Sequence, residues 1–337
     1  MKYEYELLPV GDADAIIIRH FIGDEQFVIV IDAGNIGDGA KIKRHIKKYF
    51  DTNYIDLTIC THPDSDHKDG FFELLEDEDI TIEELWLSDP AYYMDETDIK
   101  KYHNRANAIN ALRKMWCKSD DETKNLIDLA IERKVVVRHV IDGIKHSQLP
   151  ISVVGPTEDY YLESAKLMIE EYGVQTYDES DKNKYDTAFQ ISDDEAKSVI
   201  DGEEDSSPFN ASSLILLYEP GDGKRLLFAG DANTTSIQMM IDKYKWLRNV
   251  DLLKVPHHGS KRNMNTKLID ALNPKKSYIS SAGTVKHPCN ALVYWLSKHG
   301  PVYSSHQCSG YLHCASSEMP ARAGAVRIKP LREKQKL

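Results

Sequence analysis

The sequence predicts an α/β fold built from two similar halves. Short apolar runs typical of strands alternate with segments whose apolar residues recur at helical spacing, and this alternation occurs on both sides of a polar stretch at 178–208. Three of the strand-like runs end in His or Asp residues, which are common metal ligands. We therefore expect a functional site where the strands end.

The first half contains short strands separated by tight turns at Gly11-Asp12 and Gly23-Asp24. A helix with a basic outer face is expected at 40–50, with His45 at the surface, and a second helix at 70–75. The strands are expected at 3–9, 14–20, 26–32, 55–60, 84–88, 135–137 and 151–156.

Residues 89–133 depart from this alternation, because two helices are expected there, at 100–117 and 122–133. Such a helical insertion would form either a lid or partner surface, or an added packing layer. After a helix at 157–172 comes the acidic stretch 178–208, which has few large apolar residues. We expect an exposed, flexible loop there.

The second half repeats the alternation of strands and helices. Strands are expected at 210–218, 225–229, 250–255, 276–280 and 302–304, and helices at 234–244, 264–272 and 290–299. The chain is thus expected to form a single domain at 1–330, followed by a basic tail at 331–337.

The composition is that of a globular protein, with 41% hydrophobic residues among 337. No apolar run approaches the roughly 20 residues needed to cross a bilayer, and the N-terminus lacks the basic and then apolar pattern of a signal peptide. We therefore expect a cytoplasmic protein without a membrane partner. Five unevenly spaced cysteines argue against a disulfide framework.

The net charge of −12 is unevenly distributed. From Lys254 to the end, fourteen Lys and Arg stand against three acidic residues, which leaves +11 there and −23 in the rest of the chain. Clustered cations favour contact with phosphate. The charge of this third of the chain predicts either a rim of positive charge beside the site or a solvated surface with a basic tail.

One stretch places four potential metal ligands within six residues, directly after the strand expected at 55–60. Imidazole and carboxylate groups at the point where a strand opens into a loop suit zinc, manganese or iron. The alternative is a solvated Asp-rich turn whose histidines cap the next helix. The four residues are His62, Asp64, Asp66 and His67.

Two later strands also end in potential ligands. Asp231 follows the apolar run that ends at 229, and His257 with His258 follows the run that ends at 255. Three strands that each deliver a metal-type side chain at their ends argue against the alternative of a solvated turn.

The order of these motifs resembles the metallo-β-lactamase fold. His-x-Asp-x-Asp-His, Gly-Asp and Val-Pro-His-His-Gly-Ser follow an N-terminal Val-Gly-Asp-Ala-Asp-Ala and Val-Ile-Asp-Ala-Gly. More narrowly, the chain is similar from about residue 3 to about residue 328 to the soluble hydrolase domain of the ComEC competence protein and its stand-alone relatives. The resemblance implies a four-layer αββα sandwich and a prokaryotic origin.

The resemblance also implies a cofactor of one or two divalent ions, zinc or manganese. Such an ion lowers the pKa of a bound water towards about 7 and provides hydroxide at neutral pH. The expected ligands are His62 and Asp64 for the first ion, Asp66, His67 and His257 for the second, with His258 as the alternative to His257, and Asp231 as the bridge.

Asp64 departs from the family, most of whose members have histidine at this position, and no third histidine completes the first ion's site near 210–218. A carboxylate adds negative charge there and favours a harder ion such as manganese. Two hypotheses follow. The chain is either a dinuclear hydrolase with a carboxylate-rich first position, or it binds one ion mainly through Asp66, His67, Asp231 and His257.

The stretch 280–288 resembles the last motif of the family, in which a His-Pro pair lies near the active-site mouth. This implies that His287 binds substrate phosphate or protonates the leaving oxygen, with Lys286 and Ser260 as phosphate contacts. The alternative is a surface histidine. The residues expected to take part in catalysis are Asp66, Asp231 and His287.

The resemblance to ComEC implies a phosphodiesterase or nuclease that acts on nucleic acid through a metal-bound hydroxide. The fold hosts many hydrolases, so a small phosphodiester or an ester is a second candidate substrate. In a third alternative, the chain is a weakly active metal-binding subunit that acts through a protein partner, for example an ATPase, bound by the helical insertion.

Overall fold

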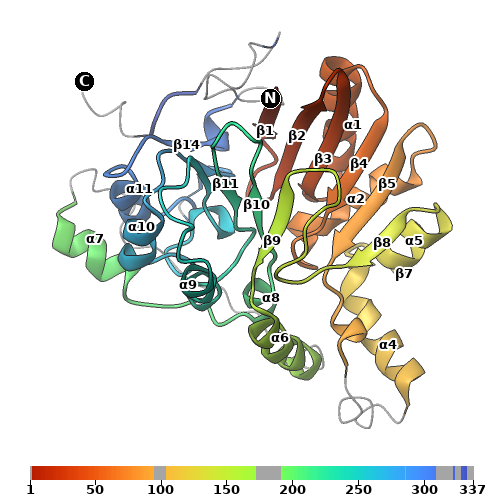
Figure 1. The fold of residues 1–337 in the computed structure, drawn as a ribbon. Helices are drawn as coiled ribbons and strands as arrows, with labels where there is room; N and C mark the ends of the chain where they lie inside the picture. Colours follow the sequence, from red (N-terminus) through yellow and green to blue (C-terminus); the bar gives the residue numbers. More distant parts are fainter. Residues whose placement is uncertain are drawn as a thin grey trace.

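Two six-stranded sheets packed face to face form the centre of the computed structural model (Figure 1). The structure describes residues 2–94, 104–171, 191–284, 286–308, 322 and 328–331. The strands of the first sheet all precede residue 140, and those of the second sheet all follow residue 150. The two halves expected from the sequence are present as two sheets, but the boundary lies earlier than expected, because the strand expected at 151–156 in the first half belongs to the second sheet.

The first sheet contains, in spatial order, β1 (Tyr3–Leu7), β2 (Ala15–Ile22), β3 (Glu25–Ala33), β4 (Tyr54–Ile59), β5 (Thr81–Leu87) and β8 (Val136–His139). The first three strands pair antiparallel, whereas β3, β4, β5 and β8 run parallel. Parallel strands end at the same edge of a sheet, so the loop after β4 opens beside the loop after β5.

The second sheet repeats this arrangement. It contains, in spatial order, β14 (Val302–Ser304), β13 (Ser277–Ile279), β12 (Leu252–Lys254), β11 (Leu226–Phe228), β10 (Ile215–Tyr218) and β9 (Ile151–Gly155). Strands β9, β10 and β11 pair antiparallel, and β11 to β14 run parallel. The carboxyl ends of β11 and β12, which precede Asp231 and His257, therefore meet at one edge.

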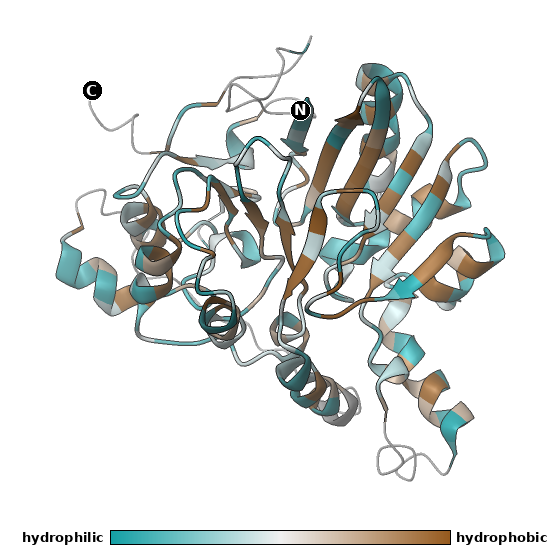
Figure 2. Ribbon diagram, in the orientation of Figure 1, coloured by the Kyte–Doolittle hydropathy of each residue, from teal (hydrophilic) through white to brown (hydrophobic). Residues whose placement is uncertain are grey.

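Hydrophobic side chains form three layers. Successive side chains of a strand point to opposite faces, so Ile16 and Ile18 pack between the sheets while Ile17 packs under the helices. Figure 2 shows hydrophobic residues concentrated on the central strands. Helices cover both outer faces, so the predicted four-layer αββα sandwich is confirmed. The helices are α1 (Asp38–His45), its π-helical continuation η1 (Ile46–Phe50) and α2 (Ser65–Glu76) on the first sheet, and α9 (Thr234–Lys243), α10 (Thr266–Leu272) and α11 (Asn290–Leu296) on the second.

Two of the element boundaries that differ from the sequence-based expectation lie close to the strand ends where the site was expected. Helix α2 begins at Ser65 and not at 70, with Asp64 as its N-cap, so Asp66 and His67 lie in its first turn. The strand expected at 210–218 begins only at Ile215. Before it lies the short helix α8 (Pro208–Ala211). The helix is capped by the side chain of Ser207 and begins with a proline, which is well suited to a first helical position.

The expected surface position of His45 is wrong. Its side chain is fully buried, and its Nε2 contacts the carboxylate of Glu6 on β1. Burial lowers the pKa of His45 to about 3, so the ring is neutral. Helical spacing alone does not distinguish the margin of the buried face from the solvent face, and His45 lies on the side that faces β1.

The insertion at 89–133 contains a hairpin as well as helices, and its residues 95–103 lie outside the described ranges. The helix expected at 122–133 begins only at Leu126, because the residues before it pair in the hairpin. Ala108, Leu112 and Trp116 are buried in the core layer of the first sheet. The insertion consists of η2 (Pro90–Tyr92), α4 (Arg105–Arg113), η3 (Lys114–Trp116), β6 (Cys117–Lys118), β7 (Asp121–Asn125) and α5 (Leu126–Glu132).

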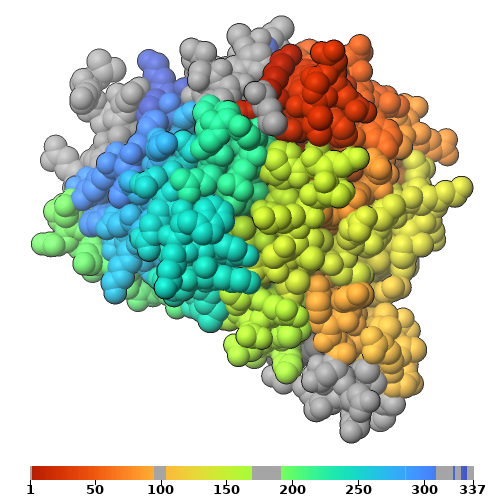
Figure 3. Space-filling model, in the orientation of Figure 1, coloured from red at the N-terminus to blue at the C-terminus, as the bar shows by residue number. Residues whose placement is uncertain are grey.

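Helix α6 (Glu158–Glu171) lies beside the insertion in the space-filling view (Figure 3). The expectation of a flexible loop at 178–208 is wrong for residues 193–200, which form a helix. Residues 178–190 lie outside the described ranges, but α7 (Asp193–Ile200) begins with a capping box of Ser192 and Glu195. No helix of the described ranges is long and apolar enough to cross a membrane.

We expect Trp116→Ala to destabilise the protein by about 3–5 kcal/mol, because it removes a fully buried indole and leaves a cavity. The matched control is Trp246→Ala, since Trp246 is half exposed and its removal should change the free energy of unfolding by less than about 0.5 kcal/mol. Urea unfolding followed by circular dichroism measures both. Equal unfolding midpoints for the two variants would show that the insertion is not part of the core.

Candidate metal centre

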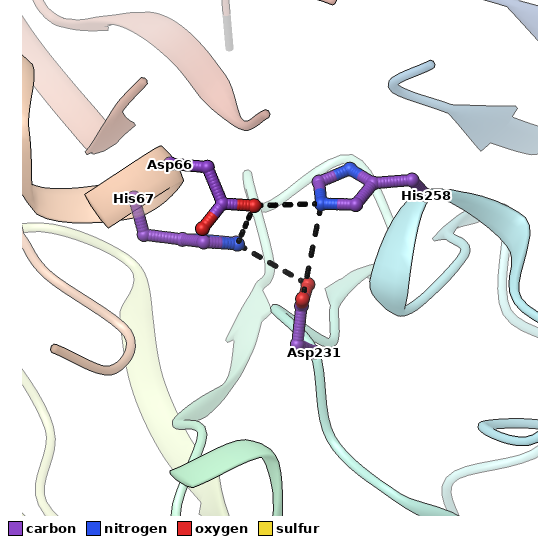
Figure 4. Close-up of side chains that lie close together, drawn as sticks. All are labelled: Asp66, His67, Asp231 and His258. Carbon is purple, nitrogen blue, oxygen red and sulfur yellow. Dashed lines mark hydrogen bonds and ion pairs between the residues drawn. The ribbon is translucent and has the colours of Figure 1, made fainter. Parts of the chain in front are cut away.

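Four side chains from both halves of the molecule meet where the strands end (Figure 4). Asp66 and His67 come from the first turn of α2, Asp231 follows β11, and His258 lies in the 3₁₀ turn η4 (His257–Gly259) after β12. Each offers one ligand atom, and these atoms all lie within 4.8 Å of one another. Asp66, a predicted ligand from the first half of the chain, thus lies beside the predicted ligands Asp231 and His258 from the second half.

The contacts in this four-residue cluster run between imidazole nitrogens and carboxylate oxygens. His258 Nε2 lies 3.1 Å from Asp66 Oδ2 and 3.8 Å from Asp231 Oδ2. His67 Nε2 lies 3.3 Å from Asp231 Oδ1 and 3.8 Å from Asp66 Oδ2. Each imidazole therefore faces both carboxylates.

The other ring nitrogen of each imidazole is held by an acceptor. His67 Nδ1 donates to Asp32 Oδ2 over 2.8 Å, and His258 Nδ1 donates to the carbonyl of Ser280 over 3.2 Å. When the ring is neutral, this proton stays on Nδ1 and each Nε2 directs a lone pair at the carboxylates. Lone pairs that face lone pairs repel unless a proton or a metal cation lies among them, so the cluster fits a metal ion.

Unpartnered buried atoms support the same conclusion. His67 Nε2, His62 Nε2 and Asp231 Oδ1 are buried and make no hydrogen bond with the residues that the structure describes, although buried polar atoms almost always have a partner. His62 packs on His67 with 4.1 Å between the ring centroids, and its Nε2 lies 3.5 Å from Asp64 Oδ2. His62 and Asp64 thus form a second pair of ligand type beside the cluster.

The backbone is shaped to bring the ligands together. Gly230 has φ +49°, and a Cβ there would lie 2.4 Å from Ser213 Oγ, so only glycine fits directly before Asp231. His257 and His258 adopt φ of 47° and 53°, a conformation that is costly for residues other than glycine. Such strain is typical of functional sites.

Residues 8–283 match the metallo-β-lactamase superfamily. This match covers most of the chain and includes the four-residue cluster and His62. The chain belongs to the metallo-β-lactamase superfamily. Members of this superfamily are metal-dependent hydrolases, and they typically bind divalent metals. A metal-dependent hydrolase is therefore the general class of this protein.

Two bacterial proteins are similar to part of this chain. ComE operon protein 3 of Bacillus subtilis (strain 168) is 32% identical over 97 residues, which is 28% of this chain and 12% of that protein. Competence protein ComA of Neisseria gonorrhoeae is 27% identical over 121 residues, which is 35% of this chain and 17% of that protein. The matches thus span less than a fifth of either relative.

Two solved structures are also similar to this chain. The metallo-β-lactamase fold protein YhfI from Bacillus subtilis has a TM-score of 0.44 at 10% identity, over 89% of this chain and 96% of that chain. A mutant of the CmlA β-hydroxylase has a TM-score of 0.44 at 14% identity, over 89% of this chain and 52% of that chain.

The cluster concentrates negative charge. Burial alone would raise the pKa of Asp231, but His67, His257 and His258 hold it well below its usual range. Burial alone would lower the pKa of His67, but Asp231, Asp32 and Asp66 outweigh burial and raise it well above its usual range. Carboxylates that favour a positive charge this strongly also attract a metal cation.

Asp32 contacts the cluster, although the sequence analysis did not assign it to the site. Besides His67, its carboxylate accepts the backbone N–H and the hydroxyl of Thr61, each over 2.8 Å. Asp32 therefore fixes both the ring of His67 and the start of the loop that carries His62 and Asp64. The available signal was an acidic residue at the end of an otherwise apolar strand, in Val30-Ile31-Asp32-Ala33-Gly34.

His257 lies at the margin of the four-residue cluster. Its Nδ1 donates to Asn263 Oδ1 over 3.0 Å and lies 3.3 Å from Asp205 Oδ2, while its Nε2 is 3.9 Å from Asp231 Oδ2. Asp205 in turn accepts from the amides of Asn210 and Asn263, over 2.7 and 2.8 Å. Asp205 and Asn263 were not expected at the site, and Asp205 belongs to the stretch that was predicted to be a loop.

His287 is buried beside the two adjacent histidines, and its ring centroid lies 5.7 Å from that of His257 and 6.0 Å from that of His258. Burial, and then the neighbouring His257 and His258, lower the pKa of His287 to about 3. Ser260 is also buried, and its Oγ accepts the N–H of Arg262 over 3.2 Å. Lys286 is half-buried directly before His287.

Several cations of the C-terminal third are buried or paired with acidic side chains, so they do not contribute to the positive rim that was one of the two expectations. Lys254 is fully buried and contacts Asp14, so it is not a surface residue. Several exposed cations face acidic side chains. These pairs are Arg262 with Glu203, Lys275 with Asp251, and Lys298 with Asp193. The tail at 332–337 lies outside the described residues.

We expect His258→Ala to weaken Zn²⁺ binding more than His257→Ala does, because His258 Nε2 belongs to the four-residue cluster. Loss of the marginal His257 should weaken binding by about tenfold, the size of effect seen when a residue that supports a ligand is removed. Equilibrium titration of chelator-stripped protein with Zn²⁺ measures both affinities, and thermal unfolding checks that each variant is folded. The reverse order of affinities would assign His257 as the ligand.

Proposed function

We propose that this chain is a metal-dependent phosphodiesterase, and most specifically a nuclease. The observation that carries the proposal is the meeting of imidazole and carboxylate lone pairs from both sheets at the strand ends. Asp66 and Asp64 are partly exposed, with 29% and 40% of their side chains accessible. The cluster is therefore open to solvent on one side, as a catalytic metal site needs to be.

In this proposal Asp66, His67, Asp231 and His258 hold one divalent ion, zinc or manganese. His62 and Asp64 offer a second position, with Asp231 between the two, and the carboxylate of Asp64 makes that position the harder one. When bound, such an ion lowers the pKa of a coordinated water to about 7 and supplies a nucleophile at neutral pH. Asp32 and the Ser280 carbonyl keep the ligand rings in the required orientation.

His287 is placed to act on the substrate. It is buried beside His257 and His258, and its Nδ1 makes no hydrogen bond with any residue of the described ranges. We propose that it contacts a phosphate oxygen or the leaving oxygen of a bound phosphodiester. Ser260 and Lys286, which lie close to these histidines in sequence, are proposed as further phosphate contacts.

A nucleic-acid strand is the first candidate substrate. The chain is similar over part of its length to ComE operon protein 3 and to a protein named as a competence protein, and this supports a substrate related to DNA. The acidic overall charge does not favour nucleic acid, so binding would depend on local cations near the site.

A small phosphodiester is the second candidate, because the ion pairing of Arg262, Lys275 and Lys298 reduces the positive charge that a long polyanion would meet. A role as a weakly active subunit with a protein partner is the third candidate. The packing of Leu112 and Trp116 into the core leaves the remainder of the insertion as the surface for such a partner.

We expect the protein to cleave labelled single-stranded or double-stranded DNA or RNA when Mn²⁺, Zn²⁺ or Mg²⁺ is added, and Asp231→Ala to abolish cleavage. Asp231 faces both imidazoles of the cluster, so its loss removes the centre of the ligand set. Gel analysis of the products measures both. If metal-loaded protein cleaves none of these polymers, the nuclease proposal is wrong and the other two candidates take its place.

Salt dependence separates the first two candidates. Nucleic-acid binding releases counterions, so its affinity should fall steeply with rising salt. Hydrolysis of bis(p-nitrophenyl) phosphate, a small phosphodiester, should change little over the same range. If KM for the polymer is insensitive to salt between 50 and 200 mM, a range over which about 10³–10⁵ in affinity is typically lost, a nucleic-acid strand is not the substrate.

We expect His287→Ala to lower kcat by about 10²–10⁴ without changing metal content, because general acid–base and phosphate contacts contribute in this range. The matched control is His299→Ala, whose ring contacts Asp270 and Asn273 and not the site. Steady-state kinetics and metal analysis measure both effects. Unchanged turnover in His287→Ala would remove His287 from the reaction.

A further inference from the structure

A lysine lies buried directly behind the metal centre. Lys254 is the last residue of β12, three residues before the turn that carries His257 and His258, and its side chain is completely inaccessible to solvent. Its ammonium group contacts the carboxylate of Asp14, which is also completely buried and lies 240 residues away in the sequence. A buried lysine is rare and normally depends on such a partner.

Lys254 reaches the loop that carries a proposed ligand. Its Nζ donates to the carbonyl of Gly230 over 3.0 Å and lies 3.9 Å from Asp231 Oδ1. The same carbonyl accepts the backbone N–H of His257 over 3.2 Å. The ammonium group is therefore joined to both ligand-bearing loops of the second sheet.

Asp14 connects the same lysine to the first sheet. The residue precedes β2, and its backbone N–H donates to the carbonyl of Asp66 over 3.2 Å. Its Oδ2 lies 3.9 Å from His67 Nδ1. Asp14 thus contacts the first turn of α2, which supplies the two proposed ligands of the N-terminal half.

A short series of contacts therefore crosses from one half of the ligand set to the other. It runs from the Asp66 carbonyl to Asp14, from Asp14 to Lys254, and from Lys254 to the Gly230 carbonyl directly before Asp231. The contacts are buried, where charged hydrogen bonds are strong and their geometry is restricted.

We propose that Lys254 is a positioning residue, whose buried ammonium group locks the loop of Asp231 against Asp14 and the start of α2 so that ligands from both sheets meet around one ion. The inference rests on the metal centre proposed above, but it does not depend on the identity of the substrate.

A purely electrostatic role for Lys254 predicts the opposite effect on metal binding. An ammonium group 3.9 Å from Asp231 repels a divalent cation, so its removal should strengthen metal binding if charge were its main contribution. If Lys254 instead positions the ligands, its removal should weaken metal binding. The sign of the change therefore distinguishes the two roles.

The test uses the complete chain, stripped of metal and titrated with Co²⁺ alone. Lys254→Met removes the charge and keeps the length of the side chain, and it is expected to weaken Co²⁺ binding about 10–100-fold, as loss of a residue that supports a ligand does. The Co²⁺ absorption spectrum should change as well, since it reports the coordination geometry. Isothermal titration calorimetry gives the dissociation constants.

Two further variants keep the test decisive. Lys254→Met leaves Asp14 buried without its partner and can fail to fold, so Lys254→Met with Asp14→Asn removes both charges. This double variant is expected to fold and still to bind Co²⁺ at least tenfold more weakly than the natural protein. Lys275→Met is the matched control, because it removes a largely exposed lysine of the same half, paired with Asp251, and should leave Co²⁺ binding unchanged.

The outcomes separate the inference from the proposed function. If the natural protein binds no Co²⁺, the metal centre itself is refuted, and the inference fails with it. If the natural protein binds Co²⁺ and a folded Lys254 variant binds it equally well or more tightly, the positioning role is wrong and the metal centre stands. Weaker binding with an altered spectrum supports the positioning role.

Discussion

Carboxylates and imidazoles meet at the ends of the two sheets in a cluster that is open to solvent at Asp66, and their facing lone pairs are stable only with positive charge among them. Asp32 and the Ser280 carbonyl hold the protons of His67 and His258 on the side away from Asp66 and Asp231. The repulsion that remains is what a divalent cation relieves. The fold, the strained backbone and the buried lysine all help to bring these charged groups together.

The four-layer sandwich makes the meeting geometrically possible. The loops after β4, β11 and β12 open where parallel strands end, so residues from distant parts of the chain come together without long connections. Gly230, His257 and His258 adopt left-handed backbone conformations there. The three hydrophobic layers supply the stability that tolerates this strain.

The surroundings of the centre add further carboxylates and packing. Asp64 places a carboxylate beside His62, and Asp205, from a stretch of acidic composition, contacts His257. The insertion extends the packing over the first sheet, with Trp116 in its core layer. These features add negative charge and bulk around the site. They are the physical basis of the alternative in which the substrate is a small phosphodiester.

The sequence by itself predicted the alternation of strands and helices, the presence of two halves, and the ligand-type residues that meet in the cluster, because hydrophobic periodicity and ligand chemistry are local properties. It did not show that the second sheet begins at 151, that His45 and Lys254 are buried, that 121–125 forms a hairpin strand, or that Asp32 and Asp205 contact ligand-type histidines. Nor did it show that His258, and not the adjacent His257, lies in the four-residue cluster. Only the tertiary structure decided these points, because they depend on which side chains from distant segments face one another across the two sheets.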